Sequence, residues 1–241
     1  NVPKEEFTEK SLETLKLVNL EGYENRMPSE LSGGQQQRVA VARAIVLKPK
    51  VLLFDEPLSN LDAKLRRQVR EDIREIQQKL GVTTIYVTHD QEEALAISDK
   101  VIVMNNAIIA QQGSPKELYN FPKTKFVANF IGDANVVKAE IINQNNNVYE
   151  IQLAEMKINI ESDQKLESSV SVSLRPEKIT ISKSPEENSI HASVNNASFV
   201  GNSYQYIVNS KVGKIYVVSS DTNEIFNVGE NVYLNFDEKE L

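Results

Sequence analysis

Two short apolar runs constrain the fold of this chain more than any other feature. They are VLLF at residues 51–54 and VTTIYVT at residues 82–88. The first is continuously apolar and the second is rich in β-branched residues. Both properties are typical of strands buried on both faces of a parallel sheet. The sequence therefore predicts two such strands.

The residues between these runs have a helical pattern. We expect Gly81 to end this helix as a residue with positive φ, and the charge-rich residues 64–79 to form a solvated face with pairing between positions four apart. The apolar side chains recur at helical spacing, at Leu58, Leu61, Leu65, Val69, Ile73, Ile76 and Leu80. The alternation of helices and strands predicts an α/β architecture for the first half.

The pattern changes near residue 135. Residues 114–131 predict short helical pieces interrupted by Pro115 and Pro122, and a polar NQNNN run at 143–147 is expected to be a loop. Beyond residue 135 we predict an all-β module of about 100 residues, a small barrel or sandwich. The predicted domains are residues 1–134 and 135–241. Strand-like alternation occurs at residues 148–153, 169–174, 178–182, 204–208, 214–218 and 231–236.

Composition excludes several classes of function. The chain has no cysteine and two histidines, so thiolate and histidine-rich metal sites are excluded. No apolar run approaches the roughly 18 residues needed to span a bilayer as a helix. Residues 135–241 hold 15 Asp+Glu against 9 Lys+Arg, a net charge of −6. That acidic balance disfavours nucleic acid as a partner.

Two residues of the second half receive structural interpretations. We expect His191 to lie on a strand face and not to be a ligand. Arg175-Pro176-Glu177 is expected to set a strand edge, because proline cannot donate a hydrogen bond to a sheet.

The stretch LSGGQQQRVAVARA at residues 31–44 predicts a helix with a free amino end. Ser32 can cap the helix, and Gln35 completes a capping-box pattern. Gly33 and Gly34 leave the backbone bare, so an oxyanion could approach the first-turn N–H groups. Taken alone, the stretch favours an ordinary capped helix after a turn, and only the motifs that follow favour a phosphate site.

The end of the first strand carries two acidic residues. In open α/β sheets, ligands bind at the carboxyl ends of the strands. Here Asp55 could bind Mg²⁺ through water, and Glu56 could act as general base on an attacking water. His89 follows the second strand and becomes a candidate donor to a transferring phosphoryl group. The alternative is a pair of solvated surface acids and an exposed histidine.

Together these motifs resemble the ATP-binding-cassette (ABC) ATPases. LSGGQQQ at 31–37 resembles the family's signature motif, and VLLFDEP at 51–57 resembles the Walker B strand with its catalytic glutamate. SNLDA at 59–63 is similar to the D-loop, and THD at 88–90 to the switch histidine. In the second half, SLRPEKI at 173–179 and SFVGNSYQYIV at 198–208 resemble the TOBE module of importer ATPases.

The resemblance implies a fold and a set of roles. The fold is the C-terminal part of a P-loop (RecA-like) cassette with a remnant of its helical subdomain, followed by an oligonucleotide-binding-like TOBE module. Two cassettes pack head to tail in this family and trap ATP with Mg²⁺. The cofactor-binding residues implied are Ser32, Gly33, Gly34 and Gln35, which face ATP held by the opposite subunit, and Asp62, which reaches across the interface.

The motif G-x-x-x-x-G-K-[ST], which holds the β- and γ-phosphates, occurs nowhere in the 241 residues. In the family this P-loop and the Q-loop lie upstream of the signature motif. We therefore expect the chain to be an N-terminally incomplete cassette that is inactive by itself.

The resemblance favours the ATPase subunit of a bacterial binding-protein-dependent importer. Ferric iron is the first expectation for the solute, followed by polyamines or phosphonates, with sugars and sulfate close behind. Expected partners are a second ATPase subunit, transmembrane permease subunits and, indirectly, a periplasmic or lipoprotein solute-binding protein. The expected location is the cytoplasmic face of the cell membrane. Alternatives are a non-transport ABC protein acting on nucleic acid or in translation, and a regulatory β module with a vestigial cassette.

Overall fold

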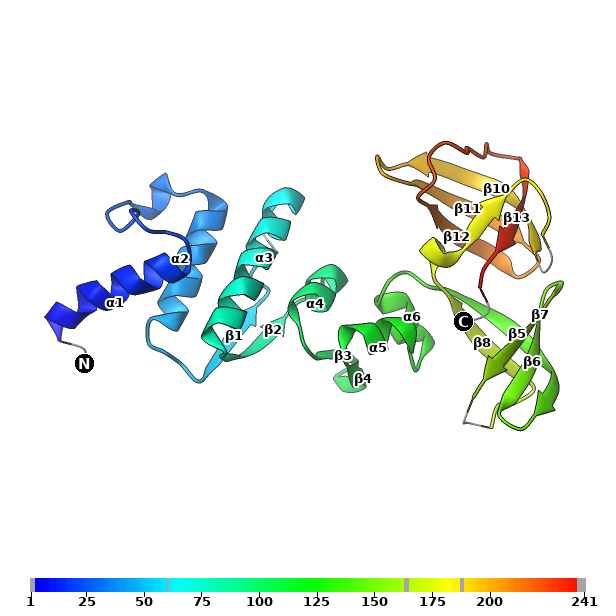
Figure 1. The fold of residues 1–241 in the computed structure, drawn as a ribbon, viewed down its shortest axis with the longest axis horizontal. Helices are drawn as coiled ribbons and strands as arrows, with labels where there is room; N and C mark the ends of the chain where they lie inside the picture. The colour runs from blue at the N-terminus through cyan, green and yellow to red at the C-terminus, as the bar shows by residue number, and fades with distance from the viewer. Residues whose placement is uncertain (1–2, 60, 163–164, 187–188, 238–241) are drawn as a thin grey trace. The chain divides into compact units, whose positions relative to one another are not determined.

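The computed structural model describes residues 3–59, 61–162, 165–186 and 189–237 (Figure 1). The chain divides into two compact units, Asn1–Val101 and Ile102–Leu241. The residues from 102 to 134, which the sequence analysis assigns to the first domain, fall in the second unit. No helix in the described ranges is both long enough and apolar enough to cross a membrane.

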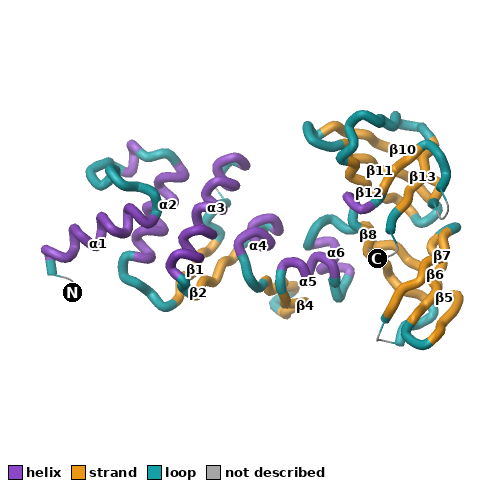
Figure 2. The backbone as a smooth tube through the Cα atoms, in the orientation of Figure 1, coloured by secondary structure: helices purple, strands orange, loops and turns teal. Residues whose placement is uncertain are grey.

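The first unit alternates helices with two strands, as the sequence predicts (Figure 2). Its elements are α1 (Lys4–Leu17), the 3₁₀ helix η1 (Pro28–Glu30), α2 (Gly33–Ile45), β1 (Val51–Asp55), α3 (Ala63–Leu80), β2 (Thr83–Val87) and α4 (Gln91–Ile97).

Strands β1 and β2 pair in parallel, with Val51 opposite Thr83 and Asp55 opposite Val87. The parallel pairing confirms the α/β prediction. The expectation that both faces are buried is wrong for the described residues, because burial alternates along the strands. Leu52 is 4% exposed, whereas its neighbour Leu53 is 67% exposed. The apolar core of this unit, to which α2 and α3 contribute, lies against one face of the sheet.

Helix α3 is shorter than its apolar stripe. It begins at Ala63, with Asp62 as its N-cap, so Leu58 and Leu61 precede it. Leu58 is nevertheless fully buried in the core of this unit. At the other end Gly81 has φ of 58°, and its N–H donates to the Gln77 carbonyl. This confirms the predicted glycine stop.

The second unit begins with the hairpin β3–β4 and two short helices. Helix α5 starts at Pro115, with Ser114 as its cap, so this proline begins a helix and does not interrupt one. Its elements are β3 (Val101–Asn105), whose first residue belongs to the first unit, β4 (Ile108–Gly113), α5 (Pro115–Asn120), α6 (Lys125–Phe130), β5 (Asn135–Asn145), β6 (Val148–Leu153), β7 (Met156–Glu161), β8 (Ser169–Leu174), the 3₁₀ helix η2 (Pro176–Lys178), β9 (Thr180–Ser182), β10 (Ile190–Phe199), β11 (Tyr204–Ser210), β12 (Gly213–Ser219) and β13 (Asn231–Asn235).

The all-β module consists of two antiparallel sheets around one apolar core. Their strand orders are β7-β6-β5-β8 and β12-β11-β10-β13-β9. The core draws buried residues from both sheets. Buried Asn135 links them, because its side chain donates to the carbonyls of Leu174 and Tyr216 and accepts from the Tyr216 N–H.

Three strands of this module, β5, β7 and β10, were not predicted from the sequence. β-Bulges interrupt the alternation in β5, between Ile141 and Asn143, and in β10, between Val194 and Asn196, whereas β7 alternates as regularly as the predicted strands. The NQNNN run was expected to be a loop. In fact β5 continues through Asn145, and the turn starts at Asn146, whose φ is 54°. Asparagine tolerates this left-handed backbone better than most residues do.

Arg175 has a role that the strand-edge interpretation missed. It follows β8, an edge strand, but its side chain is buried, with 6% exposure. The guanidinium donates to the carbonyls of Tyr119, Ala128 and Ile131 and lies 3.9 Å from the centre of the Tyr119 ring. Arg175 therefore fastens α5 and α6 to the β module. His191 lies on β10 and faces Tyr233 edge-on, as expected for a strand-face residue.

Candidate functional site

Helix α2 begins with the predicted capping box. The Ser32 hydroxyl accepts a hydrogen bond from the Gln35 N–H at 3.4 Å, and the Ser32 N–H donates to Gln35 Oε1 at 2.9 Å. A helix of this length leaves its first-turn N–H groups without acceptors inside the helix. The capping box uses the N–H of Gln35, and no acceptor among the described residues takes the N–H groups of Gly33 and Gly34.

The two glycines at this helix end differ in surroundings. Gly33 is exposed, whereas Gly34 is buried against helix α3. A Cβ atom added at Gly34 would lie 2.7 Å from Leu65 Cδ1 and 3.4 Å from Val69 Cγ2. The absence of a side chain at Gly34 therefore also allows α2 and α3 to approach closely. The sequence pattern alone indicates only the approach of an anion at this position.

Helix α2 is further fixed to α3 by an ion pair. Arg38 Nε donates to Asp72 Oδ2 at 2.8 Å, and a second guanidinium nitrogen lies 2.5 Å from the same oxygen. The Asp72 side chain is 9% exposed and the Arg38 side chain 22% exposed. This contact sets the position of the helix that carries Ser32.

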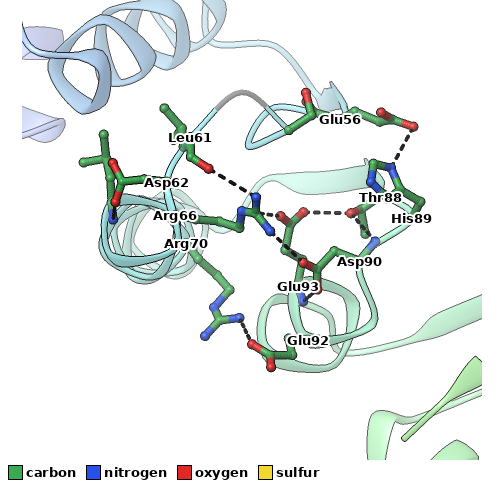
Figure 3. A network of polar contacts seen from close by, with 12 residues as sticks. Glu56, Leu61, Asp62, Arg66, Arg70, Thr88, His89, Asp90, Glu92 and Glu93 are labelled. Atoms are coloured by element: carbon green, nitrogen blue, oxygen red, sulfur yellow. Dashed lines mark hydrogen bonds and ion pairs between the residues drawn. The ribbon is translucent and has the colours of Figure 1, made fainter. Parts of the chain in front are cut away.

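The carboxyl ends of β1 and β2 bring two predicted catalytic residues together. Because the strands are parallel and in register, Asp55 and Glu56 lie beside the segment that starts at Val87. The Glu56 N–H donates to the Val87 carbonyl at 2.9 Å. His89 Nδ1 lies 3.3 Å from Glu56 Oε1, and both side chains are open to solvent (Figure 3). Glu56 has φ of 44°, a left-handed backbone that is uncommon for glutamate.

Asp62 acts as a helix cap in this structure. Its Oδ1 accepts from the N–H groups of Lys64 at 3.1 Å and Leu65 at 3.0 Å. The carboxylate thereby holds the first turn of α3, and its role across a subunit interface stays a prediction. Asn60, in the same SNLDA motif, lies outside the described residues.

Charged residues of α3 make contacts that the sequence analysis missed. Three arginines four residues apart pair with acids at α4 and its flanks: Arg66 with Asp90 at 3.1 Å, Arg70 with Glu92 at 3.6 Å and Arg74 with Asp99 at 2.6 Å. The expected pairing within the helix is present between Lys79 and Glu75. The prediction of a mainly solvated face is wrong for these arginines, because α4 packs beside α3.

The segment Thr88-His89-Asp90 is held by hydrogen bonds to the buried residue Glu93. Glu93 is 3% exposed and accepts hydrogen bonds from the hydroxyls of Tyr86 and Thr88. Burial and the neighbouring Glu93 carboxylate raise the pKa of Tyr86 above its usual range. Asp90 caps α4 through the Glu93 N–H, and its own N–H donates to Thr88 Oγ1. His89 therefore lies between two residues that are held in place.

The donor set fits a magnesium nucleotide better than a metal bound by protein alone. Among the described residues, no three His, Cys, Asp or Glu side chains gather to hold a metal ion. Asp55 is exposed at the strand end, and Mg²⁺ is commonly bound by one or two carboxylates together with substrate phosphates and water. Asp55 therefore fits that mode of binding.

Comparison with known proteins identifies two domains. Residues 2–59 match the model of the ABC transporter family, and residues 172–241 match the model of the TOBE domain. The first match includes Ser32, Gly33, Gly34, Gln35, Asp55 and Glu56 and ends before Asp62 and His89.

Individual relatives match nearly the whole chain. The Fe(3+) ions import ATP-binding protein FbpC of Agrobacterium fabrum is 47% identical over 97% of this chain and 66% of its own length. The protein of the same name from Rhizobium etli is 44% identical over 98% of this chain and 67% of its own length. The present chain thus spans about two thirds of each relative's length.

A solved structure, that of cbiO1 from Clostridium perfringens, part of the ABC transporter complex cbiONQ, is 35% identical and covers 49% of this chain and 47% of its own, with a TM-score of 0.46. The domain matches and the long relatives agree with each other, and together they show that this chain belongs to the family of ABC transporter ATP-binding proteins that carry a TOBE domain.

Proposed function

We propose that this chain is the larger part of the ATP-hydrolysing subunit of a bacterial importer that takes up ferric iron. The catalytic part of the proposal is based on one observation. Glu56 and His89 follow the ends of two parallel strands, and Glu56 Oε1 lies 3.3 Å from His89 Nδ1. A carboxylate and an imidazole at such an edge can act on a phosphate from neighbouring positions.

The chemistry follows from the positions of these groups. Glu56 accepts a proton from the water that attacks the γ-phosphate. His89 orients Glu56 and donates a hydrogen bond to the phosphoryl group as charge develops on it. Asp55 would hold Mg²⁺, and this ion would neutralise phosphate charge when bound. Since Glu56 and His89 are open to solvent here, closure of a second subunit over the site would exclude water from it.

The start of α2 supplies the other half of a nucleotide site. Its free first-turn N–H groups and Ser32 suit the γ-phosphate of ATP held by a second copy of the subunit, packed head to tail. Gly33, Gly34 and Gln35 shape this helix end, and Asp62 would reach across the interface. The subunit would sit on the cytoplasmic face of the membrane through permease subunits, with a solute-binding protein on the other side.

The P-loop motif is missing from the 241 residues, so we propose that the chain alone does not turn over ATP. Residues 1–134 would serve as the nucleotide-binding part and residues 135–241 as the TOBE-like part.

The names of the relatives support ferric iron over polyamines or phosphonates as the solute. The net charge of −6 in residues 135–241 speaks against an alternative role on nucleic acid. Retention of both Glu56 and His89 speaks against a vestigial cassette.

A chimera tests the function directly. This chain replaces the matching two thirds of the Agrobacterium relative, in a strain whose own copy is deleted, and uptake of radioactive Fe(III) is measured. We expect uptake with the chimera and none with its Glu56→Gln form. Lys183→Met, an exposed residue of the β module, is the matched control and should keep uptake. A chimera that is produced at normal levels but takes up another solute, and no iron, would refute the substrate assignment.

A further inference from the structure

Arg66 contacts two segments that each carry a predicted site residue (Figure 3). Its Nη2 donates to the Leu61 carbonyl at 3.1 Å, immediately before Asp62 in the chain. Its Nη1 donates to Asp90 Oδ2 at 3.1 Å, immediately after His89. One guanidinium therefore bridges the SNLDA segment and the THD segment, which are separated by more than 20 residues in the sequence.

Both contacts lie next to parts of the backbone that are held firmly. On one side, Asp62 caps α3, and its own carbonyl accepts the Arg66 N–H at 2.8 Å. On the other side, Asp90 is held by Thr88 Oγ1 and by the Glu93 N–H. A displacement of either segment must therefore pull on the guanidinium or break a hydrogen bond to it.

One donor of the Arg66 guanidinium makes no hydrogen bond to the described residues. Arg66 Nε is buried and has no hydrogen-bond partner in the part of the chain that the structure describes, although Glu93 Oε1 lies 4.0 Å away. A buried donor without an acceptor costs free energy, and a shift of about 1 Å would bring this pair to hydrogen-bond length. The contact therefore has a second arrangement within reach, as a contact between moving segments requires.

We propose that Arg66 is a positioning residue that couples the segment carrying Asp62 to the segment carrying His89. The importance of this coupling rests on the proposed function, in which Asp62 lies at the subunit interface and His89 beside the γ-phosphate. Arrival of the second subunit at Asp62 is then transmitted through Leu61, Arg66 and Asp90 to the position of His89.

The test measures the imidazole NMR signals of the two histidines. The chain has two histidines, so histidine-labelled protein gives one imidazole signal from His89 and one from His191 in the β module, which serves as an internal reference. The perturbation is Asp62→Ala, which removes the cap of α3 at the Leu61 end. It is introduced into the wild-type chain, into Arg66→Ala and into Arg70→Ala. Arg70 is the matched control, because it pairs with Glu92 between the same two helices and makes no hydrogen bond or ion pair with the described residues of either segment.

We expect Asp62→Ala to shift the His89 signal in the wild-type and Arg70→Ala backgrounds, and the shift to be lost in the Arg66→Ala background. Circular dichroism verifies folding of each variant. Should Arg66→Ala not fold, Arg66→Lys replaces it, because a single ammonium group cannot bridge both oxygens as the planar guanidinium does. A His89 shift of equal size with and without Arg66, or no shift in the wild-type background, overturns the proposal. The measurement needs no nucleotide, so its outcome is separate from that of the iron-uptake test.

Discussion

The Arg38–Asp72 ion pair is expected to determine how firmly the helix that carries Ser32 is held. At 2.8 Å and an effective dielectric constant of about 20, the attraction between the two charges is about 6 kcal/mol. Desolvation of the two partly buried ions costs several kcal/mol each and offsets most of that gain. The pair as a whole therefore contributes little, whereas loss of one partner leaves an uncompensated charge in the helix interface.

These magnitudes predict a particular pattern in a double-mutant cycle. Asp72→Ala and Arg38→Ala should each destabilise the contact of α2 with α3 by about 3 kcal/mol. Arg38→Met combined with Asp72→Leu, which fills the same space with apolar groups, should lie within about 1 kcal/mol of the wild type. In the cycle closed by Arg38→Ala, Asp72→Ala and the Arg38→Ala/Asp72→Ala double variant, the interaction energy should be about 2 kcal/mol or more.

Amide hydrogen exchange measured by mass spectrometry is the suitable assay. It reports the local opening free energy of peptides from α2 and α3 separately from the β module, which global unfolding of a chain with two compact units would not do. Lys79→Ala, which removes an exposed ion pair with Glu75 from the same helix, is the control and should cost less than about 1 kcal/mol. Single variants that each cost under about 1 kcal/mol, or a double variant equal to their sum, would refute this reasoning.

Three further predictions concern the second unit. Arg175→Leu leaves three carbonyls without their donor and should cost about 2–4 kcal/mol, measured as faster amide exchange in α5 and α6, whereas Lys183→Met, which removes an exposed cation 5.7 Å from a ring centre, should cost less than about 1 kcal/mol. Burial, followed by the hydrogen bond to Glu177, raises the pKa of Tyr119 to about 12, so the folded state holds this proton more tightly than the unfolded chain does. Its contribution to stability should be complete below about pH 10 and disappear as the pH rises towards 12, and denaturation curves of Tyr119→Phe should lack that part of the alkaline loss. Ala107 has φ of 62° in the β3–β4 turn, so Ala107→Gly should slow amide exchange in this hairpin by stabilising it by about 0.5–1 kcal/mol, and unchanged exchange would contradict the strain argument.

Features that depend on local sequence could be predicted, and they include much of the site. The Ser32 cap and the Gly81 stop follow from neighbours within four residues, where propensities and capping rules apply. The meeting of Glu56 with His89 follows from one further assumption, that the two apolar runs form adjacent parallel strands. That assumption is correct here.

Contacts between distant side chains could not be predicted in the same way. Arg66 and Asp90 are 24 residues apart, and Arg38 and Asp72 are 34 apart. Whether such residues meet depends on the rotation of α3 about its axis and on its height against α2 and α4. A charge-rich helical face gives the same pattern whether it is solvated or covered by a neighbouring helix. The acids clustered directly after His89 do indicate that basic residues pair with them. The sequence does not show which basic residues these are.

The most direct test of the central claim is the rate of phosphate release from MgATP by the purified chimeric transporter, with and without Glu56→Gln. A general base of this kind contributes about 10²- to 10⁴-fold to the rate, so we predict a loss of at least about 100-fold while ATP binding is retained. An equal loss in the Lys183→Met control would point to a defect in assembly. Turnover by the Glu56→Gln form within about twofold of the wild-type rate would contradict the assignment of Glu56, and with it the catalytic site proposed at the ends of β1 and β2.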